Sequence, residues 1–262
     1  MPNSKWIRFF IVKKDHMWYY YYGDNMLESD KIKKVFTKIL IFISLILGMA
    51  LFSLIPATIF KIDVEKLGLI AKTIYLISCD LGYILVLYFI YHKSINKDIK
   101  NYFKKFGTNF ETSFKYYFLG LITMLVSNVI ITLFFKEANA GNEEQVREAI
   151  NNLPIYMIFS VSLYAPFVEE IIFRKSIKEI IPGKNIITKY LYILTSGLIF
   201  AGMHLLGQIT NPLDYLFLIP YGALGVAFAA LYHKTDNIFS TIIMHSLHNT
   251  VTIILYFTIG GM

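Results

Sequence analysis

The stretch Phe167-Val168-Glu169-Glu170-Ile171-Ile172-Phe173-Arg174 places two adjacent carboxylates at the end of an apolar run, Ile155 to Val168, that is long enough to enter a membrane. Ionised groups within a membrane are costly and usually functional. On a helix, Glu170 and Arg174 stand at i and i+4 and can form an ion pair, whereas Glu169 points about 100° away. Glu169 therefore has no partner on its own helix, and we ask which residues face it.

The composition is that of a membrane protein. The 262 residues are 56% hydrophobic and only 16% charged, far more apolar than a soluble domain of this size. We expect an all-α, polytopic membrane helical bundle of about seven or eight transmembrane helices. Each of seven apolar segments approaches the length of about 20 residues that a spanning helix needs. They lie at about 36–59, 69–91, 115–135, 154–173, 190–208, 213–232 and 238–259.

The chain divides into three parts. Residues 1–35 form a basic and aromatic arm, which we expect in the cytosol or at the membrane interface, and residues 36–152 contain the N-terminal transmembrane helices. Residues 153–262 hold the later spans and, with them, the polar groups discussed below. Residues 137–152 are acidic and predict a helix or loop outside the membrane.

The distribution of lysine and arginine predicts the orientation. Twenty of them lie in the N-terminal stretch through Lys38 and in the 92–115, 174–189 and 233–237 loops, against five in the opposite loops. Positive charge concentrates in cytoplasmic loops, so we expect a multi-pass protein of the cytoplasmic membrane with a cytosolic N-terminus. The net charge of +7 is explained by this asymmetry, and we expect no nucleic-acid partner.

The second predicted span carries an isolated acid, Asp80, next to the single cysteine, Cys79. A lone acid in a span usually finds a partner across the bundle, which is the role we expect for Asp80, with a direct chemical role as the alternative. A single cysteine can form no disulfide within the chain.

Three later spans place polar groups one helical turn apart. The fourth span has Glu169, the fifth has Phe200-Ala201-Gly202-Met203-His204, and the seventh has His245-Ser246-Leu247-His248-Asn249. Polar groups in apolar helices should turn inward and meet each other or water. A buried carboxylate can take a proton from water, imidazoles can position that water, and an amide can stabilise an oxyanion. The set predicts peptide hydrolysis without a serine or cysteine nucleophile.

These motifs resemble those of the CPBP family, the CAAX-processing and bacteriocin-processing (Abi) intramembrane proteases. Glu-Glu-x-x-x-Arg at 169–174, Phe-x-x-x-His at 200–204 and His-x-x-x-Asn at 245–249 occur in that family's order and approximate spacing. The similarity covers roughly residues 155–258, and the first half of the chain matches only as membrane helices. The resemblance implies that residues 153–262 form the catalytic transmembrane core of an endopeptidase, working in a membrane cavity open to the cytosol.

The resemblance also implies roles for individual residues. Glu169 would activate the water, His204 would help to hold it, and His245 with Asn249 would stabilise the oxyanion. Glu170 and Arg174 would give structural support to the helix that carries Glu169. By helix rise, however, His204 lies about 20 Å along a span that begins near Tyr190, deeper than Glu169.

The need for a cofactor stays open at this stage. The family has been described both as metalloproteases and as metal-independent glutamate proteases. Glu169, His204 and His245 would supply three ligands if a divalent ion such as zinc were bound. Asn249 is a poor zinc ligand and a good oxyanion donor, which favours the arrangement without metal.

The substrate is expected to be a peptide or protein in or beside the lipid bilayer. The many Ile, Lys and Asn residues are typical of AT-rich bacterial genomes, where prenylated proteins would be unexpected, so peptide maturation or bacteriocin immunity is favoured. The alternative is a non-enzymatic immunity or regulatory membrane protein. A small transporter is disfavoured because no inverted repeat is visible.

Overall fold

The structure is a computed structural model that describes residues 10–14, 17–21, 25–135 and 141–259. It is helical apart from two short strands, β1 (Phe10–Lys14) and β2 (Met17–Tyr21), which pair in antiparallel fashion with Phe10 opposite Tyr21. The α-helices are α1 (Asn25–Leu51), α2 (Leu54–Phe60), α3 (Leu69–Lys104), α4 (Phe106–Phe134), α5 (Gly141–Asn152), α6 (Pro154–Phe159), α7 (Ala165–Glu169), α8 (Ile177–Ile180), α9 (Ile186–Leu205), α10 (Leu218–Thr235) and α11 (Ile238–Thr258). Shorter helical turns η1 (Val64–Lys66), η2 (Ser160–Tyr164), η3 (Glu170–Ser176) and η4 (Pro212–Phe217) connect or interrupt them.

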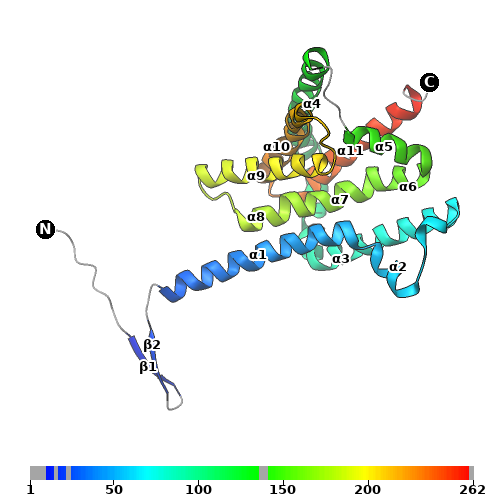
Figure 1. The fold of residues 1–262 in the computed structure, drawn as a ribbon. Coiled ribbons are helices and arrows are strands. Elements are labelled where there is room, and N and C mark those ends of the chain that lie inside the picture. Colours follow the sequence, from blue (N-terminus) through cyan, green and yellow to red (C-terminus); the bar gives the residue numbers. More distant parts are fainter. Residues whose placement is uncertain (1–9, 15–16, 22–24, 136–140, 260–262) are drawn as a thin grey trace.

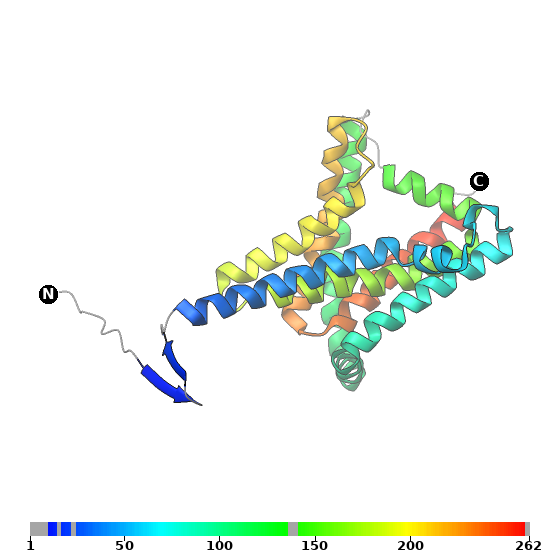
Figure 2. The ribbon, with the colours of Figure 1, turned by 60° about the horizontal axis from the view of Figure 1, so that its bottom comes forward.

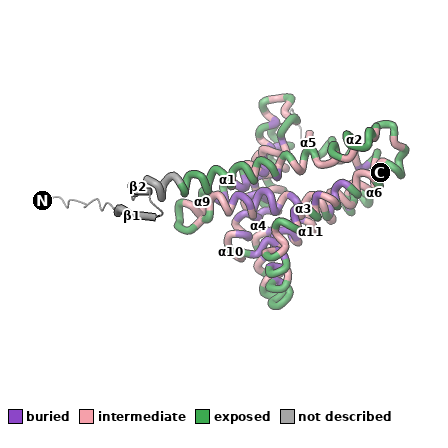
Figure 3. Tube along the Cα trace, turned by 90° about the horizontal axis from the view of Figure 1, so that it is seen from below, coloured by how far each residue is buried: buried purple, intermediate pink, exposed green. Residues whose placement is uncertain are grey.

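Seven helical segments within the described residues are long and apolar enough to cross a membrane, which confirms the polytopic all-α fold. They are Asp30–Leu51, Leu69–Lys104, Phe106–Phe134, Pro154–Ile180, Ile186–Leu205, Pro212–Thr235 and Ile238–Thr258. Only 6% of the most apolar part of the first segment is buried, against 50% in the sixth. Figure 3 shows the same gradient, with exposed residues on outer helices and buried ones where α10 and α11 cross. The outer apolar faces therefore point toward lipid.

The prediction of a loop at residues 92–115 is wrong. α3 continues to Lys104 and α4 begins at Phe106, so Lys105 alone separates the two helices. Lysine is a good helix former, and a helix can continue beyond the apolar region into water at little cost. The fourth span likewise continues through Arg174 to Ile180, where a loop was expected.

Figures 1 and 2 show α1 running beside the fourth span, where it contacts η3 and α8. α10 packs against α9 on one side and α4 on the other, and α11 crosses next to η2 and α7. α5 lies at the end of the bundle near α6 and the end of α11 (Figure 1). This arrangement brings the fourth, fifth and seventh spans around one interior region.

Small residues permit the close packing of α9 against α10. A Cβ atom at Gly197 would lie 2.5 Å from Val226 Cγ2 and 2.9 Å from its backbone nitrogen, and one at Gly225 would lie 2.9 Å from the Gly197 carbonyl oxygen. Membrane helices associate through such close backbone approach. Gly197 and Gly225 therefore form a packing surface between the fifth and sixth spans.

The fourth span is not a regular helix. Two turns within it, η2 and η3, have π-helical hydrogen bonding, and Ala165 donates its N–H to the Ser160 carbonyl five residues earlier. Pro166 follows and has no N–H to donate. Neither residue therefore donates a hydrogen bond to the Val161 carbonyl, which is left without its usual partner within the helix. Such π turns occur frequently at functional sites.

Gly197→Ala is expected to lower the melting temperature of the detergent-solubilised protein, because the new methyl group would separate α9 from α10 at a cost of about 1–3 kcal/mol. Gly202→Ala, on the same helix, is the matched control, since a Cβ there would meet nothing within 4 Å. Equal melting temperatures for the two variants would contradict the proposed packing.

Candidate active site

A buried chain of charged and polar groups links η3 to α11. Arg174 Nε lies 3.2 Å from Glu170 Oε2, and His245 Nδ1 lies 2.9 Å from Glu170 Oε1. The Arg174 and Glu170 side chains have no exposed surface, and His245 is 5% exposed. The guanidinium lies over the Phe200 ring, 4.4 Å from its centroid, and the His245 ring stacks on Phe228. A hydrogen bond from Nδ1 to the Glu170 carboxylate fixes the imidazole in orientation.

Glu169 lies on the other side of the same imidazole. Its Oε2 is 3.8 Å from His245 Nε2, and its side chain is 17% exposed. This separation is too long for a direct hydrogen bond, but a water molecule can bridge groups at such a distance. Two consecutive glutamates thus lie next to the two nitrogens of one ring: Glu170 contacts Nδ1, and Glu169 lies near Nε2. One carboxylate can therefore hold the ring while the other remains open to the cavity.

Asn249 is held by the irregular backbone of the fourth span. Its Nδ2 donates a hydrogen bond of 2.8 Å to the Val161 carbonyl, the one released by the π turn before Pro166. A side-chain amide carries two N–H donors, so this contact orients the group and leaves its second N–H for another acceptor. The break in the helix is therefore what positions Asn249.

His204 is oriented from within its own helix. Its Nδ1 lies 2.9 Å from the Phe200 carbonyl, and its ring stacks on Tyr221 with centroids 5.2 Å apart. When Nδ1 donates to that carbonyl, Nε2 remains as an acceptor. His248 contacts Tyr117, with 3.4 Å between its Nδ1 and the Tyr117 hydroxyl.

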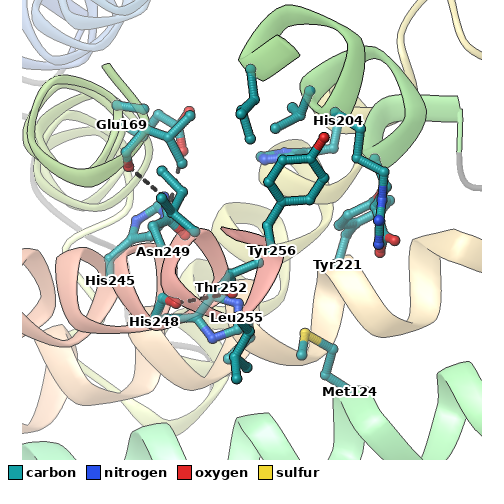
Figure 4. A pocket seen from close by; sticks show the side chains of 18 of the residues that line it. Met124, Glu169, His204, Tyr221, His245, His248, Asn249, Thr252, Leu255 and Tyr256 are labelled. Carbon is teal, nitrogen blue, oxygen red and sulfur yellow. Dashed lines mark hydrogen bonds and ion pairs between the residues drawn. The ribbon is translucent and has the colours of Figure 1, made fainter. Parts of the chain in front are cut away.

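The four predicted catalytic residues, Glu169, His204, His245 and Asn249, all line one cavity of about 590 Å³. In Figure 4, Glu169, His245 and Asn249 lie on one side of this pocket and His204 with Tyr221 on the other. The difference in depth expected for His204 therefore does not place it outside the pocket. The cavity also reaches α5 and the end of α11, where its walls include Glu143, Arg147 and Tyr256.

The fit of a metal ion can be tested on these side chains. No group of three or more His, Cys, Asp or Glu side chains in the described part of the chain is arranged to hold one. Glu169, His204 and His245 share a cavity without converging on a common point, so the donor set in this arrangement does not fit a catalytic metal.

Two features of the site escaped the sequence analysis. The bond from His245 to Glu170 joins different spans, and helical periodicity reports only neighbours on one helix. The release of the Val161 carbonyl depends on Pro166, whose position inside the fourth span was a signal that could have been used.

Comparison with known proteins shows which family this region resembles. Residues 151–251 match the family described as type II CAAX prenyl endopeptidase Rce1-like. Residues 151–251 are therefore similar to the CAAX-protease (CPBP) family. The CAAX-protease region includes every residue of the buried chain and all four predicted catalytic residues.

Three curated bacterial proteins are similar over about half of the chain. UPF0177 protein YvdC of Lactococcus lactis is 27% identical over 137 residues, which are 52% of this chain and 49% of YvdC. Membrane-embedded CAAX protease MroQ of Staphylococcus aureus is 32% identical over 135 residues, 50% of this chain and 51% of MroQ. Putative membrane peptidase YdiL of Bacillus subtilis is 29% identical over 141 residues, 53% of each chain. The chain thus spans about half the length of these relatives, and no solved structure matches it significantly.

Glu170→Ala is expected to destabilise the protein by about 3–5 kcal/mol, because it leaves the Arg174 charge buried without a counter-ion. Glu111→Ala removes a carboxylate that pairs with Lys115 on the exposed surface of α4, and should leave the melting temperature nearly unchanged. Thermal unfolding in detergent measures both, and a similar loss in the two variants would refute the structural role of Glu170.

Proposed function

We propose that this protein is an intramembrane endopeptidase in which Glu169 activates the attacking water. The observation that carries the proposal is the pair formed by Glu169 and His245, 3.8 Å apart on the wall of a cavity that His204 and Asn249 also line. The match of residues 151–251 to the CAAX-protease family supports the same reaction class.

In the proposed reaction, a water molecule lies between Glu169 and the imidazoles. Its oxygen attacks the carbonyl carbon of the peptide while one of its protons passes to the Glu169 carboxylate. The second N–H of Asn249 donates to the resulting oxyanion, and so does Nε2–H of His245 when the imidazole carries both protons. Glu169 then returns the proton to the amide nitrogen as the carbon–nitrogen bond breaks, which yields a carboxylic acid and an amine.

The supporting residues have separate tasks in this scheme. Glu170 holds His245 through Nδ1, and Arg174 balances the charge of Glu170, so the imidazole cannot rotate away from Glu169. His204 keeps its Nε2 available to accept a hydrogen bond from the water. The largely apolar cavity suits a peptide segment that lies in or beside the bilayer.

Glu169→Gln should reduce cleavage at least about 100-fold, since the amide cannot act as a general base. The measurement uses proteoliposomes and a library of fluorogenic peptides with apolar segments, and Glu148→Gln on the exposed face of α5 is the control. Full activity of Glu169→Gln would refute the catalytic assignment. Retention of a cellular phenotype without cleavage would support the alternative of a non-enzymatic immunity or regulatory protein.

We also propose that the protein lies in the cytoplasmic membrane with its N-terminus in the cytosol, as its lysine and arginine distribution predicts. α5 and the end of α11 then lie on the outer side, and the catalytic cavity extends toward them. The described cavity therefore favours access from the outer side, in place of the cytosolic opening that the family resemblance implied.

Cysteine labelling tests this orientation. In a Cys79→Ala background, Glu148→Cys on α5 should react with a membrane-impermeant maleimide in intact cells. Lys104→Cys, exposed at the end of α3, should react only after permeabilisation. The opposite pattern would invert the topology and restore a cytosolic opening.

A further inference from the structure

A second, polar cavity lies between α1, α3 and the fourth span, and most of its wall residues precede the matched region 151–251. It has a volume of about 230 Å³. Its walls include Ser53, Cys79, Asp80, Tyr156 and Tyr164. Nothing in the proposed reaction uses this cavity, and Asp80 and Cys79 come from a span that the family profile does not match.

Asp80 is the chemically important wall residue. It is 8% exposed, and its Oδ2 atom is buried without a hydrogen-bond partner among the described residues. The partners across the bundle that the sequence led us to expect are neutral, because the hydroxyls of Tyr156 and Ser160 on the fourth span donate hydrogen bonds to the Asp80 carboxylate. Among the described residues, the cavity walls carry no basic side chain. Neither these hydroxyls nor a water molecule would balance the charge of Asp80 when its carboxyl group is ionised.

The surroundings of Asp80 favour a small positive ion. The last turn of α1 and the break before α2 form one wall, and a helix C-terminus carries partial negative charge. Broken helices in membrane proteins coordinate cations in this way. Tyr156 and Tyr164 add hydroxyl oxygens and aromatic faces on the opposite wall.

We propose that this cavity is a binding site for one monovalent alkali cation, with Asp80 as its charged ligand. One carboxylate balances one positive charge, whereas a divalent ion would keep an uncompensated charge in the bundle. The cavity has room for the ion and several water molecules. Sodium and potassium share this chemistry, and the experiment distinguishes them.

The site adjoins the helix that carries Glu169. Tyr156 and Tyr164 lie on the fourth span, while Val161, Ala165 and Glu169 of the same span face the catalytic cavity. A bound cation would therefore stabilise the π-helical turn η2, whose Val161 carbonyl holds Asn249. The binding test below does not depend on catalysis, so it stands apart from the proposed peptidase activity.

The test is thermal unfolding of the purified full-length protein in detergent, at constant ionic strength, with sodium, potassium or N-methylglucamine chloride. The alkali ions should raise the melting temperature saturably, by about 3–5 °C at ten times the Kd, relative to N-methylglucamine. Whichever ion acts at the lower concentration is the preferred ligand.

Variants assign the effect to the cavity. Asp80→Asn should abolish the ion-dependent shift, and Tyr156→Phe should raise the ion concentration at half-saturation. Asp63→Asn, which removes an exposed carboxylate paired with Lys66, should retain the full shift. Equal melting temperatures in all three salts, or an undiminished shift in Asp80→Asn, would overturn the proposal.

Discussion

The buried ion pair between Arg174 and Glu170 is the constraint on which the site depends. Both side chains have no exposed surface, and removing ions from water costs several kcal/mol each. That cost is reduced by the groups around the pair, which include the Phe200 ring beside Arg174 and His245 Nδ1 beside Glu170. The seventh span is thereby fixed in register against the fourth, and the free nitrogen of His245 is turned toward Glu169.

Irregular backbone provides the second fixed point. A regular α-helix would use the Val161 carbonyl internally, and Asn249 would then lose the acceptor that orients it. Pro166 and the π turn η2 prevent that internal bond at the level of the catalytic cavity. The fourth span therefore lacks one internal hydrogen bond, to the Val161 carbonyl, and this carbonyl instead accepts a hydrogen bond from Asn249 of the seventh span.

Much of the fold could be predicted from sequence because lipid imposes simple rules. The seven spans follow from apolar length, and the Glu170–Arg174 pair follows from i, i+4 spacing. Helix ends were less predictable, since lysine-rich segments such as the end of α3 remain helical in water. Contacts between spans, such as Glu170 with His245, depend on packing across the bundle, which periodicity within one helix does not encode.

Motif order led us to expect that the predicted catalytic residues would surround one cavity, and Glu169, His204, His245 and Asn249 do line one. The shape of that cavity could not be predicted from the motifs. Glycine contacts at Gly197 and Gly225 draw α9 and α10 together and so determine where His204 and Tyr221 stand relative to Glu169. The cavity of about 590 Å³ leaves open space between its walls, whereas a tightly converged set of ligands would fill it. Under the proposed function, the separation of His204 from the Glu169–His245 pair leaves space for a peptide.

The fourth span separates two cavities of different character. One is largely apolar, contains the imidazoles and opens toward α5, and the other is polar and contains Asp80 near the end of α1. Cavities weaken a membrane bundle because the residues in their walls lose packing contacts, so a helix with a cavity on each of two faces is held by few contacts. Here those contacts include the buried ion pair of Glu170 with Arg174 and the amide contact at Val161. A change in the Asp80 cavity that moves η2 would therefore move the Val161 carbonyl and with it Asn249, which is hydrogen-bonded to that carbonyl. Glu169 lies further along the fourth span and would be affected less directly.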